Sequence, residues 1–315
     1  LETGDELFIL LVYQHLLHTN EIDRLLKLDN KLVLDFLKEN APRLVWKYYV
    51  AHKQIKEAVL DLIRYASDAE AASSGMDSDK ISFDQRIRCL QTASNYARKE
   101  NLDDLAHEAQ IRIECAKIQK EMSPEIVGEP LKDLTTLFKE AERKFLWSYL
   151  LKLTSLMKID DFFKRDIDMK TLWTNFLLCG DGSNVYVNEN PSEADMNRKL
   201  KALFTDIGVD KDALNPDYLV PAFEDFSNYR DFRLEWVVET LTMLKVDGSK
   251  LYNSYVKLIE VADLPVERTN QLIYAALWLL AHGFAGDISL IEDKIKNVLE
   301  NSENPYYNEI HELMT

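Results

Sequence analysis

The sequence predicts an all-α protein, an irregular α-helical solenoid built from stacked antiparallel helix pairs. Apolar residues recur at three- and four-residue spacing along the whole chain, as in Leu146, Leu150 and Leu153, which places them on one helix face. Glycine and proline, the residues that mark turns and break helices, number only 9 and 8 in 315 residues, below their usual roughly 7% and 5%. No exact period matches the tetratricopeptide, ankyrin or leucine-rich signatures, so we expect the solenoid to be irregular.

The first part of the chain divides into helices at recognisable start signals. Pro42 suits the first turn of a helix, where its missing N–H needs no partner. Ser82 and Gln85 form a capping box, because the hydroxyl and the amide can each satisfy a backbone group of the first turn. We expect Asn101 to cap the next helix, so that two long helices form an antiparallel hairpin with a very short turn. The predicted helices here cover 5–19, 21–28, 31–40, 42–52, 54–68, 82–99 and 101–121.

Helical periodicity continues to the end of the chain, with Ser192 and Asp195 marking one clear start. The predicted helices here cover 131–143, 145–158, 169–178, a segment from 192, 217–228, 231–244, 250–262, 267–284, 288–301 and 305–314. At typical lengths this makes about sixteen or seventeen helices in all. Polar, glycine-containing stretches predict flexible loops near 72–80, 122–130 and 180–191.

We predict one α-solenoid domain over 1–315. Length alone would suggest about two domains, but a helical array can continue as a single body. The chain has no initiator methionine and no signal-peptide pattern at its start. We therefore expect it to be a fragment of a larger protein.

The charge balance argues against direct binding to nucleic acid. The formal net charge is −16, whereas affinity for a phosphate backbone rests largely on lysine and arginine. No apolar run reaches the roughly eighteen residues that a membrane span needs. The three cysteines, Cys89, Cys115 and Cys179, are far apart, which predicts neither a disulfide framework nor a zinc cluster.

Residues that could carry catalysis are scarce, and we expect no catalytic site, metal or cofactor. His15 and His18 lie three residues apart on one helix face, but no H-E-x-x-H motif accompanies them. A helical metal hydrolase that uses this pair remains an alternative of a different class. Phosphate-binding loops and nucleophile elbows are absent from the sequence.

The segment 272–280, LIYAALWLL, is apolar on every helix face, so something must cover all its sides. One interpretation is that neighbouring helices of the same chain bury it. The other is that one face receives a segment of a partner protein. For the second interpretation, the candidate partner-binding residues are Leu272, Tyr274, Leu277 and Trp278.

Several short segments in the same order resemble the C-terminal helical region of the nucleoporin 155/170 family, the large scaffold nucleoporins of the inner ring. They are DELF at 5–8, LVWKYY at 44–49, ISFDQR at 81–86, AQI at 109–111, AKIQ at 116–119, LTTLF at 134–138, LW at 172–173 and the run that begins with EWVV at 235. Their collinearity over most of the chain carries the resemblance.

The resemblance implies a non-enzymatic scaffold subunit of the nuclear pore complex at the nuclear envelope. Its expected partners are linker nucleoporins, bound through short linear segments, and neighbouring inner-ring scaffold subunits. The alternative is a helical-repeat scaffold of another large assembly, similar to a proteasome-lid or vesicle-coat subunit.

Overall fold

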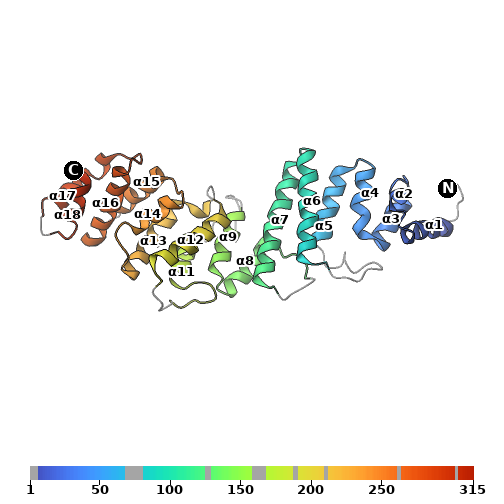
Figure 1. The fold of residues 1–315 in the computed structure, drawn as a ribbon, viewed down its shortest axis with the longest axis horizontal. Helices are drawn as coiled ribbons and strands as arrows, with labels where there is room; N and C mark the ends of the chain where they lie inside the picture. Colours follow the sequence, from blue (N-terminus) through green and yellow to red (C-terminus); the bar gives the residue numbers. More distant parts are fainter. Residues whose placement is uncertain are drawn as a thin grey trace. The chain divides into compact units, whose positions relative to one another are not determined.

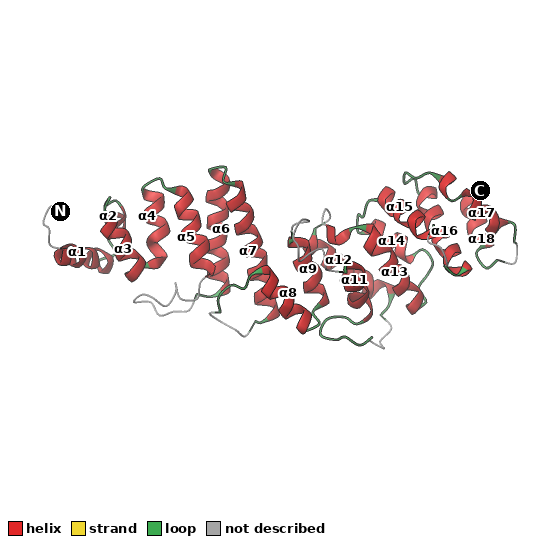
Figure 2. Cartoon of the chain, turned by 180° about the vertical axis from the view of Figure 1, so that it is seen from behind, coloured by secondary structure: helices red, strands yellow, loops and turns green. Residues whose placement is uncertain are grey.

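The computed structural model describes residues 6–67, 81–124, 129–157, 168–186, 191–208, 212–260, 264–301 and 304–315. Within these ranges every regular element is helical (Figure 2). These elements are seventeen α-helices and three short 3-10 helices. The predicted all-α solenoid is confirmed. The chain divides into two compact units, Leu1–Leu137 and Phe138–Thr315, and a single domain over 1–315 stays a prediction.

The first unit is a succession of helices in which each packs on its neighbours in the chain. The helices α4, α5, α6 and α7 lie side by side (Figure 1). Its elements are α1 (Glu6–His18), α2 (Ile22–Leu26), α3 (Lys31–Asn40), η1 (Pro42–Leu44), α4 (Val45–Ala51), α5 (Ile55–Ser67), α6 (Phe83–Lys99), α7 (Asp103–Met122) and the start of α8 (Leu134–Arg143).

The long hairpin α6–α7 is confirmed, and its start is the predicted capping box. The Ser82 N–H donates to Oε1 of Gln85 at 2.8 Å, and the Gln85 N–H donates to the Ser82 hydroxyl at 3.3 Å. Alanines line the seam between the helices, with Ala93 and Ala97 on α6 and Ala109 on α7 fully buried. Small side chains let two helix axes approach closely.

The role predicted for Asn101 is wrong. The N-cap of α7 is Leu102, with no side-chain cap, and Asn101 adopts a left-handed conformation with φ of 56°. The Asn101 N–H donates to the Arg98 carbonyl at 3.2 Å, and the Leu102 N–H donates to the Ala97 carbonyl at 2.8 Å. This is a Schellman motif, and it places a single residue, Asn101, between the C-cap of α6 and the N-cap of α7.

The same joint recurs through the chain. Six described non-glycine residues have φ between 54° and 63°, and each donates its N–H three residues back while the next residue donates five residues back. These residues are Asn20, Lys53, Asn101, Phe145, Asp231 and Lys245. A repeated backbone geometry therefore makes the corners of the stack.

The second unit contains the remaining helices, and several pack on the next helix but one along the chain, as α11 does on α13 and α13 does on α15. Its elements are α9 (Trp147–Leu156), α11 (Met169–Leu178), α12 (Glu193–Ile207), η3 (Asp212–Leu214), α13 (Pro216–Arg230), α14 (Trp236–Met243), α15 (Gly248–Ile259), α16 (Val266–Ala281), η4 (Ile288–Leu290), α17 (Glu292–Leu299) and α18 (Tyr307–Met314).

Aromatic side chains fill the centre of this unit. Trp173 and Trp236 are fully buried, and their two rings flank Phe223 with centroids 5.8 Å and 6.1 Å from it. Both indoles find acceptors, the Ala213 carbonyl at 2.8 Å and Oδ1 of Asn197 at 3.1 Å. Buried indoles thus wedge between helices with their N–H groups satisfied.

The predicted loops fall between helices where they are described. The segment 72–80 lies outside the described residues, as do 125–128 and 187–190. The described residues 180–186 contain no helix or strand, and Asp181 fixes this segment by accepting from the Ser148 N–H at 2.8 Å and from the Ser148 hydroxyl. The flexibility of the three loops stays a prediction.

Candidate protein-binding site

The predicted docking residues on α16 lie mostly in the core. Leu272 and Leu277 are each 2% exposed and Tyr274 is 6% exposed, because α14, α15, α17 and α18 pack around this helix. The Tyr274 hydroxyl donates to Oε1 of Glu235 at 3.1 Å. Burial and the neighbouring carboxylate raise the pKa of this phenol, so it stays a neutral donor.

Trp278 is the member of the predicted set that reaches the surface. It is half-buried, and its indole stacks on the His282 ring with centroids 3.7 Å apart and planes at 19°. The structure favours the interpretation that neighbouring helices bury the apolar segment. Docking on α16 stays a prediction, and only Trp278 could serve it without opening the core.

The residues considered for catalysis or metal binding are dispersed. His15 and His18 are exposed in the last turns of α1. Throughout the described ranges, no three histidine, cysteine, aspartate or glutamate side chains are placed to hold a metal ion. Burial raises the pKa of the Cys115 thiol to about 12, so this cysteine is a protonated thiol at neutral pH and a poor nucleophile.

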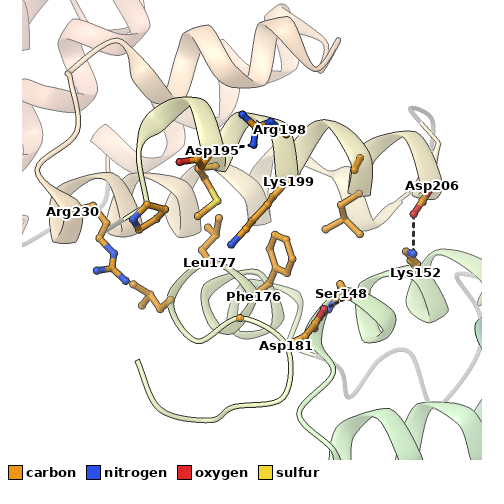
Figure 3. Close-up of a pocket in the computed structure, with 16 residues that line it drawn as sticks. Ser148, Lys152, Phe176, Leu177, Asp181, Asp195, Arg198, Lys199, Asp206 and Arg230 are labelled. Carbon is orange, nitrogen blue, oxygen red and sulfur yellow. Dashed lines mark hydrogen bonds and ion pairs between the residues drawn. The ribbon is translucent and has the colours of Figure 1, made fainter. Parts of the chain in front are cut away.

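A groove of about 790 Å³ opens in the second unit, mainly between the end of α11 and the face of α12 (Figure 3). We call it the α11–α12 groove. Phe176 and Leu177 from α11 and Met196 and Leu203 from α12 form its apolar part. The full lining is Ser148, Lys152, Phe176, Leu177, Leu178, Gly180, Asp181, Pro191, Asp195, Met196, Arg198, Lys199, Ala202, Leu203, Asp206 and Arg230.

Charged side chains form the rim of this groove, and most of them pair with each other. Lys152 on α9 contacts Asp206 on α12, with Nζ 2.8 Å from Oδ2. Arg198 contacts Asp195 within the first turns of α12 at 3.2 Å. A hydrogen bond from the Ser192 hydroxyl lowers the pKa of Asp195, which keeps that side chain ionised.

Lys199 differs from the other cations of the rim. Figure 3 draws its side chain extending from α12 into the groove, above Leu177 and Phe176. Within the described part of the chain, no carboxylate lies within ion-pair distance of its ammonium. The groove therefore has an apolar floor beside one ammonium that makes no direct ion pair, although the charge of Lys199 also acts at longer range on Asp195, four residues earlier on α12.

A buried polar network lies deeper in the second unit, between α13, α15 and α16. Oε1 of Glu224 accepts from the Tyr255 hydroxyl at 2.7 Å, while Arg268 contacts Glu224 at 3.5 Å and Asp225 at 2.9 Å. Burial raises the pKa of Glu224 despite the nearby guanidinium. The network joins three helices.

The groove and the corner residues are features that the sequence analysis missed. The groove is lined by residues between 148 and 230 from four helices, so no local motif marks it. The joints leave a weak signal, because the residue after the left-handed one is apolar in Leu102, Leu146, Phe232 and Val246. This apolar position commonly accompanies the Schellman motif.

The fold defines the class of helical scaffold proteins that are built from stacked helices. The chain belongs to the non-repetitive/WGA-negative nucleoporin C-terminal family, whose model matches residues 1–307. It is therefore a nuclear pore scaffold component, located at the nuclear pore complex in the nuclear envelope. The family match confirms the resemblance and decides against the proteasome-lid and vesicle-coat alternatives.

Solved structures with the same fold come from a fungal nucleoporin. The C-terminal domain (CTD) of Chaetomium thermophilum Nup170 is 15% identical, with a TM-score of 0.70 over 99% of this chain and 70% of that chain. The Chaetomium thermophilum Nup170 CTD–Nup145N complex has a TM-score of 0.62 at 15% identity, with coverage of 99% and 70%. No curated protein sequence matches the chain.

Proposed function

We propose that this chain is a non-enzymatic scaffold segment of the inner ring of the nuclear pore complex, which binds short segments of linker nucleoporins and contacts neighbouring scaffold subunits. The family match over residues 1–307 carries this proposal. The similar Nup170 CTD has been solved in complex with Nup145N, which supports binding of another nucleoporin by this fold.

The physical properties of the chain suit such a role. Stacked helices expose much surface for each residue, and a specific interface needs only about 800 Å² from each partner. A linker segment that becomes ordered on binding gives modest affinity for its contact area, which suits an assembly that must form and come apart.

The charge of the chain defines which partners are disfavoured. The net charge of −16 opposes direct binding to nucleic acid and accelerates the approach of basic segments at low salt. No helix in the described ranges is long and apolar enough to cross a membrane. We propose that the chain reaches the nuclear membrane only as part of the assembly.

Calorimetric titration with synthetic peptides tiled along Nup145N-type linker nucleoporins would test this function at two salt concentrations. We expect saturable binding by one tile, weaker at high salt if that tile is basic. If none of the tiles bound, the chain would act as a spacer or bind only folded neighbours, and the linker-binding part of the proposal would be wrong.

A linker segment could also bind on α16. Two variants distinguish a docking role of this helix from a role in the hydrophobic core. Trp278→Gln alters a half-buried ring, so it should weaken binding at α16 while the protein stays folded. Tyr274→Ser removes a buried ring and its hydrogen bond to Glu235, and it should destabilise the unit by about 3 kcal/mol or more. Unchanged peptide affinity in folded Trp278→Gln would exclude α16 as the docking site.

A further inference from the structure

We infer that the α11–α12 groove receives a linear peptide segment that carries a large apolar side chain beside a carboxylate, with the carboxylate paired to Lys199. The inference rests on the proposed function only in taking that segment from another nucleoporin. It adds the location of the site and the chemistry that the site recognises.

The size and the lining of the groove suit a side-chain anchor. Its volume of about 790 Å³ falls within the roughly 300–1,000 Å³ of typical ligand sites. Leu177, Met196 and Leu203 are each only 4% exposed, whereas Phe176 is half-buried and Ala202 is exposed. The apolar surface that remains open to a partner is therefore formed mainly by Phe176 and Ala202. Removing this surface from water would supply affinity in proportion to the area covered.

The charged side chains of the lining determine which charge a partner should carry at this groove. Asp206 pairs with Lys152 and Asp195 pairs with Arg198, while Asp181 accepts two hydrogen bonds from Ser148. Each carboxylate of the lining is therefore engaged inside the protein. The ammonium of Lys199 makes no direct ion pair and acts on Asp195 only at longer range, so it can pair with the carboxylate of a partner.

An exposed aromatic pair continues the site beyond Arg230. Tyr186 is 49% exposed and Tyr229 is 53% exposed, with ring centroids 5.8 Å apart. The Arg230 guanidinium, which lines the groove, lies 5.0 Å from the centre of the Tyr229 ring. Tyrosines provide large contact area at low entropic cost, so a segment anchored in the groove can extend over this pair.

A linear segment fits these observations better than a second copy of the chain. Two copies would each bring a net charge of −16, and such self-repulsion opposes association. A short segment needs only one carboxylate at Lys199, and its flanking residues remain free to be basic, which suits a chain whose net charge is −16.

Random twelve-residue peptides displayed on phage provide a probe that does not depend on nucleoporins. They would be panned on the wild-type chain with the Ala202→Trp variant as counter-selection, because a tryptophan at this exposed position fills the groove. We expect the enriched peptides to share a large apolar residue next to aspartate or glutamate. Enrichment without such a carboxylate, or equal binding to Ala202→Trp, would overturn the inference.

Charge variants then locate the recognised carboxylate. Lys199→Met should weaken the enriched peptide about tenfold, as the loss of a charge-assisted hydrogen bond predicts, and Lys199→Glu should weaken it further. Lys201→Met and Lys201→Glu are matched controls, because Lys201 is exposed on the same helix but does not line the groove. Equal effects at positions 199 and 201 would contradict a specific pair.

The same variants separate this inference from the proposed function. If a nucleoporin tile binds and Ala202→Trp has no effect on it, the proposed function stands and the groove is not its site. If no tile binds but the displayed peptides bind through Lys199, the groove stands and the linker-binding proposal fails. If wild-type chains dimerise in sedimentation and Ala202→Trp abolishes the dimer, the groove is a self-association surface and the inference is wrong.

Discussion

Helices pack through different kinds of side chain in two regions of the molecule. These regions are α5–α7 in the first unit and α11–α14 in the second. The core of α5–α7 contains seven buried alanines, Ala58, Ala66, Ala93, Ala97, Ala106, Ala109 and Ala116. The core of α11–α14 contains Trp173, Trp236, Phe223 and Phe226, all fully buried. Alanine brings neighbouring helices close together along their length, whereas large rings hold them apart and make their packing irregular.

The difference between the alanine-rich and the aromatic core suggests that one region serves regular helix packing and the other accommodates a groove. The alanine seam lies between long helices that are side by side (Figure 1). The aromatic core belongs to the unit with the α11–α12 groove, where side chains of four helices meet. We therefore expect the first region to be sensitive to added volume and the second to be sensitive to lost volume.

The largest effect is expected for Trp236→Ala. This change removes ring contacts to Phe223, Phe226 and Phe232 and should cost about 3–5 kcal/mol of unfolding free energy. Hydrogen exchange with mass spectrometry should find lost protection in α11–α14 and retained protection in α5–α7. Equal loss in both regions would mean that the chain unfolds as one body, which would favour the single domain predicted from the sequence.

Ala97→Leu tests the alanine seam by adding side-chain volume instead of removing it. Ala97 is fully buried, so three additional carbons must displace α6 from α7, at a cost of about 1–3 kcal/mol. Urea unfolding followed by circular dichroism measures this loss. The control Ala202→Leu, at an exposed alanine of α12, should remain within about 0.5 kcal/mol of the wild type. A tolerated leucine at position 97 would show that the seam has unused space.

Glu224→Gln tests whether the polar network of the second unit imposes a pH dependence. Burial raises the pKa of Glu224 above its ordinary 4.5, so the folded state retains a proton that the unfolded state has lost. The stability contributed by this proton is complete below about pH 4.5 and is lost as pH rises through the folded pKa, with a slope of at most about 1.4 kcal/mol per pH unit.

Thermal unfolding from pH 4 to 8 measures this dependence. The stability of the wild type relative to Glu224→Gln should be highest at the acid end and fall as the pH rises. Glu260→Gln, at an exposed carboxylate after α15, is the control. A relative stability that rises with pH would mean that the Arg268 guanidinium outweighs burial at Glu224.

The smallest effect is expected at a corner. Lys245 is exposed and has φ of 63°, a conformation that costs a side chain about 1–2 kcal/mol. Lys245→Gly should remove this strain but increase the entropy of the unfolded chain, for a net stabilisation of about 0.5 kcal/mol. Lys250→Gly, inside α15, should instead destabilise by about 1 kcal/mol. Chemical denaturation compares both variants, and a destabilised Lys245→Gly would contradict the strain argument.

Local signals made most of the fold predictable. The capping residues Ser82 and Ser192 start α6 and α12 as expected, because an N-cap depends only on the first turn of a helix. The corners were harder, since Lys53, Phe145 and Lys245 are not residues that favour the left-handed conformation. Their geometry is imposed by the helices on either side.

The candidate site could not be predicted because it depends on distant packing. The apolar segment on α16 was visible in the sequence, yet which neighbours cover Leu272 and Leu277 is decided by α14, α15, α17 and α18. Conversely, Lys199 has no distinguishing sequence context. It becomes notable only when α11 places an apolar surface beside it and other side chains form the direct ion pairs of the nearby carboxylates.

The corners also bear on how such a chain can change during evolution. Asparagine, lysine, phenylalanine and aspartate all occupy the same left-handed position, and the backbone supplies the hydrogen bonds there. A corner of this kind does not require a particular side chain, so substitutions can accumulate at it without altering the path of the chain. The fold is accordingly retained at 15% identity with a TM-score of 0.70 to the Chaetomium thermophilum Nup170 CTD.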